Sequence, residues 1–392
     1  MPSDFFKYQA QTSEKPLALE VSHANGCYVY DTSGKEYLDF IAGVSANSLG
    51  HCHPKVIKAI KTQVDKYTHV MVYGEFVQEP QTELCKNLIK NSPNSLHTVY
   101  LTNSGTEATE GALKLAKRYT GRHEIIAAKN AYHGSTQGSM SVSGEKSQKS
   151  AFRPLVPGSK FIHFNNTNDI EKITYKTAGV ILETIQGGAG IIVPTKGYLK
   201  KVKQKCDEVG ALLILDEIQT GIGRTGKFWG FENYNVIPDI IITGKGLGGG
   251  MPIGAFISSS EIMQTLTKNP KLGHITTFGG HPVIAAAAFT TLNEIATSNL
   301  MRETLRKEKL IRNYLVHESI IEIRGIGLML AIIVKSPERA SEIILKCLEK
   351  GLLLFWLLFE SNAIRITPPL IITDDEIEKG CKILLEALNS IE

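Results

Sequence analysis

The 392-residue sequence lacks several features that would place it in a specialised class of protein. Its formal net charge is only +4 and it has no block of five or more like charges, which argues against binding to nucleic acid or to an anionic membrane. The six cysteines are scattered and form no CxxC pair, so we expect reduced thiols and no disulfides. The N-terminal residues lack the apolar core of a signal peptide, and the apolar run 352–359 is far too short to span a bilayer. These absences together favour a cytoplasmic protein.

The sequence has enough hydrophobic residues, 42% of the total, to form a large buried core. Between about residues 95 and 260, short apolar runs rich in β-branched residues alternate with helical patterns, which is typical of a parallel sheet. The predicted strands are 97–102, 124–129, 179–184, 211–216 and 239–243. The fold class we expect is therefore α/β, with a large, doubly wound, mainly parallel sheet.

The same patterns divide the chain into three parts. Residues 46–285 contain the predicted sheet, and a helix that begins after His281-Pro282 leads into residues 286–392. There, an apolar strand pattern and a helix at 337–350 indicate a smaller α+β domain. We expect the N-terminal segment, 1–45, to pack with that smaller domain.

Polar residues stand directly after the predicted strands, where ligands bind in doubly wound sheets. Ser104-Gly105-Thr106 opens a helix with Ser104 and Glu107 as a capping box, and its free amides and positive dipole end would suit a phosphate. Taken alone, a capped helix that binds nothing is the favoured interpretation. The other residues in such positions are Tyr132, His133, Glu183, Asp216, Gln219 and Lys245.

Asp216 and Lys245 each follow an apolar strand, and each has an ordinary explanation as well as a functional one. Asp216 would be a buried carboxylate in need of a cation, either an Arg or Lys side chain or a protonated pyridine ring. Lys245 would be a surface lysine at a turn, or a partly desolvated amine that forms an imine with an aldehyde. The combination with a phosphate site and an aromatic ring at Tyr132 favours the functional explanation. These four features together match what pyridoxal phosphate requires.

At this point the chain resembles a known family along nearly its whole length. It is similar to the class III aminotransferases of the pyridoxal-phosphate fold type I superfamily, the group that contains the ornithine, acetylornithine and 4-aminobutyrate enzymes. The resemblance implies a large sheet domain with a smaller α+β domain, and a transaminase that passes an amino group from an amine or amino acid to a keto acid such as 2-oxoglutarate or pyruvate. The segments that carry it are 46–56, 104–117, 131–134, 181–190, 211–232, 238–255, 276–282 and 364–370.

The resemblance also assigns roles to individual residues. It implies that Lys245 forms the imine and moves the proton, that Asp216 pairs with the ring nitrogen, and that Gln219 donates to the ring hydroxyl. Tyr132 would stack on the ring, and Gly105 and Thr106 would hold the phosphate. Thr277 matches a threonine that reaches the phosphate from a neighbouring subunit, so a homodimer with sites at the interface is implied. Ser104, His133 and Glu183 complete the expected cofactor-binding set.

The sequence departs from the family at the positions that bind substrate. Ser135 stands where these relatives have an arginine that grips a substrate carboxylate, and Val44 stands where ornithine aminotransferase has a tyrosine. Gly188 replaces the glutamate that normally pairs with the arginine matching Arg365. We therefore expect Arg365 to take a substrate carboxylate, unless another acid such as Glu360 pairs with it. Ornithine is disfavoured as the donor, but the substrate is not identified.

Several other interpretations compete with these. GIGRTG at 221–226 matches the GxGxxG pattern of NAD-dependent dehydrogenases, but the segment after it shows poor helical periodicity. His51-Cys52-His53 indicates a turn before a helix rather than a metal site, and no metal is expected. The run 351–360 would form a buried strand or helix in preference to an apolar substrate pocket. Related chains that act as lyases, decarboxylases or aminomutases share the same cofactor residues, so the fold alone does not exclude those reactions.

Overall fold

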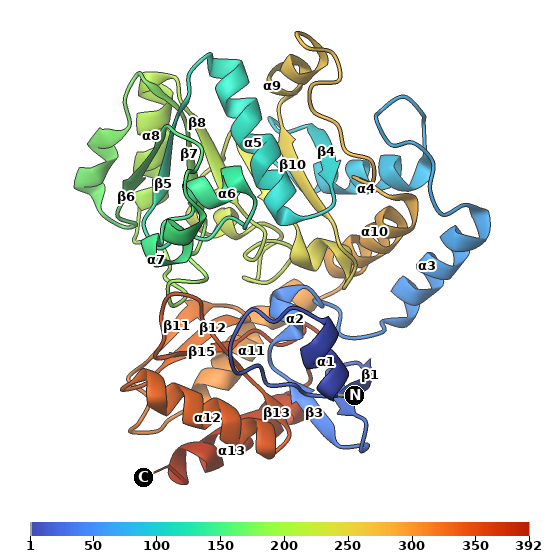
Figure 1. Cartoon of the computed structure of the whole chain (residues 1–392), viewed down its shortest axis with the longest axis vertical. Helices are drawn as coiled ribbons and strands as arrows, with labels where there is room; N and C mark the ends of the chain where they lie inside the picture. The colour runs from blue at the N-terminus through green and yellow to red at the C-terminus, as the bar shows by residue number, and fades with distance from the viewer. Residues whose placement is uncertain (1, 392) are drawn as a thin grey trace.

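The computed structural model describes residues 2–391. Figure 1 shows a large sheet flanked by helices in its upper part, and the N- and C-terminal segments side by side in its lower part. Within the described residues, the strands form one seven-stranded sheet and two four-stranded sheets. The α/β fold class expected from the sequence is confirmed.

The large sheet has the strand order β4-β10-β9-β8-β7-β5-β6. The pairs β5–β6, β5–β7, β7–β8 and β8–β9 are parallel, whereas β10 runs antiparallel to both of its neighbours. The five strands predicted from the sequence are all present, but β6 and β10 were not predicted. The strands are β4 (Thr98–Thr102), β5 (Glu124–Ala128), β6 (Ser159–Ile162), β7 (Thr177–Glu183), β8 (Leu212–Asp216), β9 (Ile240–Thr243) and β10 (Gly254–Ser258).

The central strands are buried on both faces, which explains why they appear as continuous apolar runs. In β9, the side chain of Ile241 joins one hydrophobic cluster, while those of Ile240 and Ile242 join another on the opposite face. Helix α5 (Gly105–Thr120) packs against β7, β9 and β10, and helix α8 (Tyr198–Val209) against β7 and β8. Packing on both faces therefore fixes the positions of the strand ends, and with them the polar residues that follow the strands.

Helix α5 begins and ends close to where the sequence predicts, but its N-terminal cap differs in detail. The Ser104 hydroxyl accepts a hydrogen bond from the Glu107 amide at 3.3 Å, as a capping residue should. Glu107, however, accepts from the Asn103 amide at 2.9 Å and not from that of Ser104. The predicted capping box is thus half right, because the carboxylate reaches one residue further back. Gly121 ends the helix in a left-handed conformation.

The smaller sheets join the two ends of the chain. One has the order β1-β2-β3-β13, and in it β3 pairs in parallel with β13, so the N-terminal residues share a sheet with the C-terminal ones. The other is antiparallel, with the order β11-β12-β15-β14. The strands are β1 (Val21–Asn25), β2 (Tyr28–Asp31), β3 (Glu36–Asp39), β11 (Glu322–Ile326), β12 (Met329–Ile333), β13 (Leu352–Leu353), β14 (Phe355–Trp356) and β15 (Ala363–Ile366).

The remaining helices connect and cover these sheets. Helix α10 (Pro282–Thr297) packs against α3 (Pro54–Lys66) and α4 (Glu79–Lys90), so it runs across the boundary expected at residue 285. The division at residues 45 and 285 stays a prediction. The other helices are α1 (Pro2–Tyr8), α2 (Ala42–Ser45), α6 (Gln137–Val142), α7 (Lys146–Lys149), α9 (Ser260–Met263), α11 (Leu300–Tyr314), α12 (Pro337–Glu349) and α13 (Asp374–Asn389), with 3₁₀ turns at η1 (Ser150–Phe152), η2 (Thr167–Lys172), η3 (Gly230–Tyr234), η4 (Lys245–Gly248) and η5 (Gln264–Thr267).

Among the helices formed by residues 2–391, none combines the length and apolar character that crossing a bilayer requires.

Gly254 in β10 provides a test of how tightly the sheet packs on the start of α5. A Cβ atom at this position would lie 2.2 Å from the backbone oxygen of Ser104, whereas one at Gly179 in β7 would meet its nearest atoms at 3.2 Å. We expect Gly254→Ala to destabilise the fold by about 1–3 kcal/mol and Gly179→Ala by less. Thermal unfolding of the two variants measures this. Equal melting temperatures would contradict the close approach of β10 to the β4–α5 turn.

Candidate active site

A cavity of about 360 Å³ opens at the carboxyl ends of the parallel strands. This is where the sequence places the candidate residues, and most of them line it. The expected residues that do so are Val44, Gly105, Thr106, Tyr132, His133, Glu183, Asp216, Gln219, Lys245 and Arg365. The strands bring these residues together from positions more than 300 apart in the chain.

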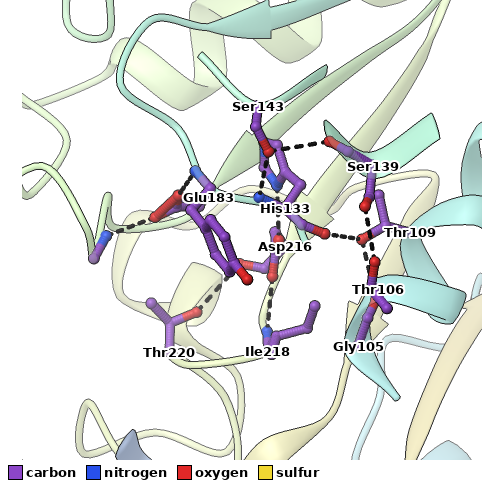
Figure 2. A network of polar contacts seen from close by, with 12 residues as sticks. Gly105, Thr106, Thr109, His133, Ser139, Ser143, Glu183, Asp216, Ile218 and Thr220 are labelled. Atoms are coloured by element: carbon purple, nitrogen blue, oxygen red, sulfur yellow. Dashed lines mark hydrogen bonds and ion pairs between the residues drawn. The ribbon is translucent and has the colours of Figure 1, made fainter. Parts of the chain in front are cut away.

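The N-terminus of α5 forms one wall of the cavity. The amides of Gly105 and Thr106 belong to the first helical turn, where no carbonyl of the helix itself can accept from them. The Thr106 hydroxyl bonds to the Ser139 hydroxyl at 2.8 Å, and the Thr109 hydroxyl donates to the His133 carbonyl at 3.0 Å (Figure 2). These bonds fix the helix start against the segment that carries His133.

Asp216, at the end of β8, is a buried acceptor with several donors around it. One carboxylate oxygen accepts from the Ile218 amide at 3.0 Å, and the other lies 2.8 Å from His133 Nδ1 (Figure 2). Because the carboxylate can only accept, Nδ1 must carry the proton. Among the described residues, His133 Nε2 has no hydrogen-bond partner, and no lysine or arginine forms an ion pair with Asp216. The cavity thus contains a carboxylate that still has capacity for a cationic donor.

Glu183, at the end of β7, holds two backbone turns together. Its carboxylate accepts from the Tyr132 amide at 2.7 Å and from the Gly187 amide at 2.6 Å. Burial raises the pKa of Glu183 to about 7, with His133 opposing the shift and Asp216 adding to it. Glu183 therefore fixes the position of Tyr132, whose ring lies at the cavity and whose hydroxyl is 3.2 Å from that of Ser135.

Lys245 begins the 3₁₀ turn η4 directly after β9, and its backbone is strained. Its φ angle is 43°, in the left-handed region that residues with a Cβ avoid. Burial of the ammonium group lowers the pKa of Lys245 to about 8; the positive charge of Arg365 adds to this shift, whereas Asp216 and Glu183 oppose it. A lysine with this pKa is neutral, and therefore nucleophilic, in a larger fraction of molecules near neutral pH than an ordinary lysine.

Arg365, on β15, is buried without a carboxylate partner. It is only 4% exposed, and its Nε and Nη1 atoms have no hydrogen-bond partner among residues 2–391. Glu360, the acid considered as an alternative partner, instead lies 3.5 Å from Arg324. That alternative is wrong. Burial lowers the pKa of Arg365 to about 10, so the side chain still carries its charge at neutral pH.

An aromatic ring lies beside Gly188, the position at which the sequence departs from the family's glutamate. A Cβ atom on Gly188 would lie 3.1 Å from the ring of Phe359, and the Phe359 amide donates to the Gly188 carbonyl at 2.9 Å. A longer side chain at 188 would displace that ring. The loss of the acid and the position of Phe359 are therefore linked by packing.

The apolar run 351–360 both joins the core and lines the cavity. Leu352, Leu353, Leu354 and Leu357 are buried, whereas Phe355, Trp356 and Leu358 line the cavity with Ile185. The sequence interpretation favoured a buried strand or helix over a pocket, and it missed the second role. The run itself gives no periodic sign of two roles, because the consecutive residues Leu352 to Leu354 are all buried and the consecutive residues Phe355 and Trp356 both line the cavity. We call Phe355, Trp356 and Leu358 the apolar wall.

Three expected residues do not line the cavity. Ser104 acts as the helix cap, and Ser135 is exposed beside Tyr132. Thr277 lies in an exposed loop outside the cavity of this single chain. Residues that line it without having been predicted from strand ends include Gly134, Gly188, Ile218 and Thr220.

Two sequence motifs have structural explanations. After GIGRTG comes only the five-residue 3₁₀ turn η3, so the helix that a dinucleotide site needs is absent from this stretch of the described chain. Arg224 of that motif is buried and donates to the carbonyls of Leu328 and Pro368.

In the His51-Cys52-His53 motif, His51 lies 2.8 Å from Asp39, and His53 precedes α3. No group of three or more metal-ligating side chains occurs within residues 2–391.

Glu217 is another buried carboxylate, next to Asp216 in the sequence, and it holds together the segments that follow β7 and β8. This carboxylate is fully buried and accepts four hydrogen bonds, from the Thr184 and Thr220 hydroxyls and from the Gly230 and Phe231 amides, at 2.5–2.9 Å. Burial raises the pKa of Glu217 to about 7, and the four donors oppose that shift. Sequence reasoning passed over Glu217, although it follows Asp216 directly. It ties the ends of β7 and β8 to η3.

The residues present fit pyridoxal phosphate. A helix N-terminus with free amides suits the phosphate, Asp216 has an acceptor free for the ring nitrogen, and Lys245 is an amine of lowered pKa for the aldehyde. The tyrosine ring at 132 and the amide of Gln219 border the space between them. The cavity volume suits a bound small molecule of this size.

Comparison with known proteins identifies the family. The family model described as Aminotransferase class-III matches residues 8–388. Over 378 residues, the chain is 41% identical to acetylornithine aminotransferase from Caldanaerobacter subterraneus subsp. tengcongensis, with 93% of each sequence covered. Acetylornithine aminotransferase from Methanopyrus kandleri is 39% identical, with 98% of this chain and 97% of that protein covered. A crystal structure of Toxoplasma gondii ornithine aminotransferase, which has pyridoxal phosphate partially occupying its active site, matches with a TM-score of 0.91 at 31% identity, covering 99% of this chain and 94% of that one.

The influence of Arg365 on Lys245 can be measured through pH. Covalent capture of added pyridoxal phosphate by the cofactor-free protein should accelerate as pH rises, with a midpoint near the Lys245 pKa of about 8. Arg365→Met removes a positive charge and should move that midpoint upward, by up to about one pH unit. Arg365→Lys keeps the charge and should leave it nearly unchanged. Stopped-flow absorbance across pH 6–10 gives the midpoints, and the same value in all three proteins would refute the coupling.

If the four hydrogen bonds to Glu217 stabilise the fold, replacing this carboxylate with an amide of the same size should lower the free energy of unfolding. In Glu217→Gln, the side-chain NH2 group must face the backbone amide of either Gly230 or Phe231, which then has no acceptor, so we expect a loss of about 1–3 kcal/mol in the free energy of unfolding. Glu318→Gln, at an exposed site, is the matched control and should change little. Urea unfolding at pH 8.5, above the Glu217 pKa of about 7, tests both variants. A Glu217→Gln protein as stable as the control would show that the four bonds are not stabilising.

Proposed function

The chain belongs to the class III aminotransferases, and from that premise we propose that it transfers an amino group from an amine with an apolar body to a small keto acid. Amino-group transfer with pyridoxal phosphate on a fold type I framework follows from membership of the family. What supports the finer statement is one observation: a buried arginine without an acid partner faces the same cavity as an apolar wall and a lysine of lowered pKa.

We propose that the chain holds the cofactor with residues from four strand ends. The amides of Gly105 and Thr106 bind the phosphate, Tyr132 stacks on the ring, and Gln219 donates to the ring hydroxyl. Asp216, oriented by His133, accepts a hydrogen bond from the ring nitrogen and keeps it protonated. When bound, pyridoxal phosphate supplies an aldehyde for the amino group and a ring that withdraws electrons from it.

Lys245 performs the proton transfer in this proposal. Once the substrate amine has replaced it, Lys245 is a free amine whose pKa of about 8 lies near the operating pH, as a general base requires. Its Nζ would take the proton from the substrate carbon that bears the amino group and return it on the other side of that nitrogen, to the carbon that the cofactor's aldehyde supplies. Thr109, Ser139 and Ser143, which fix the helix start and the His133 backbone, keep the surrounding groups in place during this step.

Arg365 binds the carboxylate of the keto acid. A guanidinium group offers paired N–H donors that match a carboxylate, and here two of its nitrogen atoms are without partners among the described residues. A short acid such as pyruvate or 2-oxoglutarate would place its carbonyl toward Lys245. This supports a small keto acid as the acceptor.

The apolar wall determines the donor in this proposal. Phe355, Trp356 and Leu358 face the cavity, and Ser135 offers no positive charge for a second carboxylate. Desolvating a charged group against such a wall would be costly, whereas an alkyl or aryl amine would gain from burial there. We therefore propose an amine with a hydrophobic body in place of ornithine or acetylornithine.

We further propose that the enzyme is a cytoplasmic homodimer. Thr277 lies in an exposed loop with Phe278, whose ring packs 4.9 Å from that of His69. A partner subunit covering this loop would bury its apolar side chains and would bring a threonine to the phosphate of the neighbouring site.

We also propose that the chain is organised in three parts, with boundaries at residues 45 and 285.

A donor series tests this function. Purified protein with bound cofactor receives a hydrophobic amine, 4-aminobutyrate, ornithine, acetylornithine, glutamate or alanine, without any keto acid, while the visible band is followed. We expect the hydrophobic amine to bleach the band fastest, because it alone matches the apolar wall. Leu358→Ser should lower kcat/KM for this donor by about tenfold, whereas Leu345→Ser, at an exposed site on α12, should not.

The alternatives give different results. If ornithine or acetylornithine bleaches the band fastest, the proposed donor class is wrong. If ammonia appears with no keto acid consumed, the protein is a lyase, a reaction that the comparisons do not favour.

A further inference from the structure

Residues Ala42–Ser45 form a turn wound in the left-handed sense beside the active cavity. Their φ angles are 49°, 57°, 58° and 68° in order, and Gly43 is the only glycine among them. A left-handed conformation is disfavoured by roughly tenfold for each residue that carries a Cβ atom. Three such residues within four positions therefore do not form this turn unless surrounding contacts impose it. We call residues 42–45 the left-handed turn.

Asp39 provides the contacts at the start of the left-handed turn. One oxygen of its carboxylate accepts from the Ile41 amide at 2.7 Å and from the Ala42 amide at 2.9 Å. The other oxygen lies 2.8 Å from His51 Nε2, which fixes the carboxylate plane. Asp39 is only 3% exposed, so water does not compete for these bonds.

The small antiparallel sheet supplies a second support. Thr367, directly after β15, donates its amide to the Phe40 carbonyl at 2.8 Å and its hydroxyl to the Ile41 carbonyl at 3.0 Å. These bonds hold the residues before the turn but do not reach Ala42–Ser45. Within the described residues, Asp39 is thus the side chain that hydrogen-bonds to Ala42, the first left-handed residue.

The left-handed turn brings two side chains to the active site. Val44 lines the same cavity as the apolar wall. The Ser45 hydroxyl accepts from Gln219 Nε2 at 3.3 Å, and Gln219 is the residue proposed to donate to the cofactor ring. The turn also packs against η4, where a Cβ on Gly246 would lie 3.4 Å from the Ser45 carbonyl oxygen. A relaxed turn would therefore move Val44 away from the cavity and release Gln219.

We infer that Asp39 is a positioning residue for amino-group transfer, which acts by holding the left-handed turn so that Val44 and Ser45 face the bound cofactor and donor. This role rests on the proposed function, because it assigns Val44 to the donor site. Asp39 itself does not line the cavity. Its effect should therefore appear in binding rather than in the proton transfer.

The first experiment compares Asp39→Asn with the wild type in the holoenzyme. An asparagine keeps the size and one acceptor, but it loses the charge that strengthens the bonds to the two amides and to His51. We expect KM for the hydrophobic amine to rise about tenfold while kcat changes by less than about threefold. Titration of the cofactor-free protein with pyridoxal phosphate, read by absorbance, should show weaker binding because Gln219 loses its partner.

A glycine substitution separates positioning from general stability. Ala42→Gly removes the Cβ that makes the left-handed conformation costly, so the double variant Asp39→Asn/Ala42→Gly should recover most of the lost affinity for donor and cofactor. Ala46→Gly is the matched control, since Ala46 has a right-handed φ of −80°. In the Asp39→Asn background, it should recover nothing.

The outcomes distinguish this role from its rivals. If Asp39→Asn raises KM and Ala42→Gly restores it, the positioning role is supported. If Ala42→Gly and Ala46→Gly behave alike, or if Asp39→Asn lowers the melting temperature without changing KM, Asp39 is a structural residue only. Should Asp39→Asn fail to fold, His51→Gln, which releases one carboxylate oxygen, must show the same KM increase and the same rescue. Failure of the proposed function would appear differently, as a wild-type protein that no hydrophobic amine bleaches.

Discussion

The need to pair buried charge organises this molecule. Asp216, Glu183, Glu217 and Lys245 lie at one edge of the large sheet, and Arg365 lines the same cavity from β15 of a smaller sheet; desolvation penalises the ionised form of each. The carboxylates are stabilised by backbone amides and hydroxyls from neighbouring turns, which forces those turns to close on the strand ends. The two cations have no such partners in the described chain, and their pKa values are lowered. The carboxylates are therefore fixed by hydrogen bonds within the protein, whereas Lys245 and Arg365 remain available to ligands.

The sequence predicts the parts of this edge that follow from strand periodicity. Asp216 and Lys245 each follow a continuous apolar run, and the carboxyl ends of parallel strands necessarily meet, so periodicity is enough to place both at this edge. The antiparallel β10 could not be predicted, because a five-residue run with glycine at its start carries no sign of its direction. The apolar wall escaped prediction for a different reason. Which face of 351–360 meets the core depends on pairings between β14 and β15 that periodicity does not define. The left-handed turn could not be predicted either. Its sequence, AGVS, contains a single glycine, and the other three residues do not normally adopt a left-handed conformation.

Substrate preference in this fold arises from packing as much as from charge. Phe359 occupies the side of Gly188, and the same short segment presents Phe355, Trp356 and Leu358 to the cavity. In our proposal, glycine at 188, where the family resemblance implies an acid, makes room for the aromatic ring and also leaves Arg365 unpaired. A single steric exchange thus alters both ends of the pocket, its anion-binding end and its apolar end. Relatives that share every cofactor residue can differ in substrate through such an exchange.

The parallel pairing of β3 with β13 has a consequence for how the protein is made. Leu38 lies beside Leu352, and Thr367 donates to the carbonyls of Phe40 and Ile41 just before the left-handed turn, so the N-terminal segment finds these partners only near the end of translation. At about 5–20 residues per second, it waits on the ribosome for at least about fifteen seconds. During that interval the central sheet, whose strands are complete by residue 258, can fold first. The active site is therefore closed last, by joining the two extremes of the polypeptide.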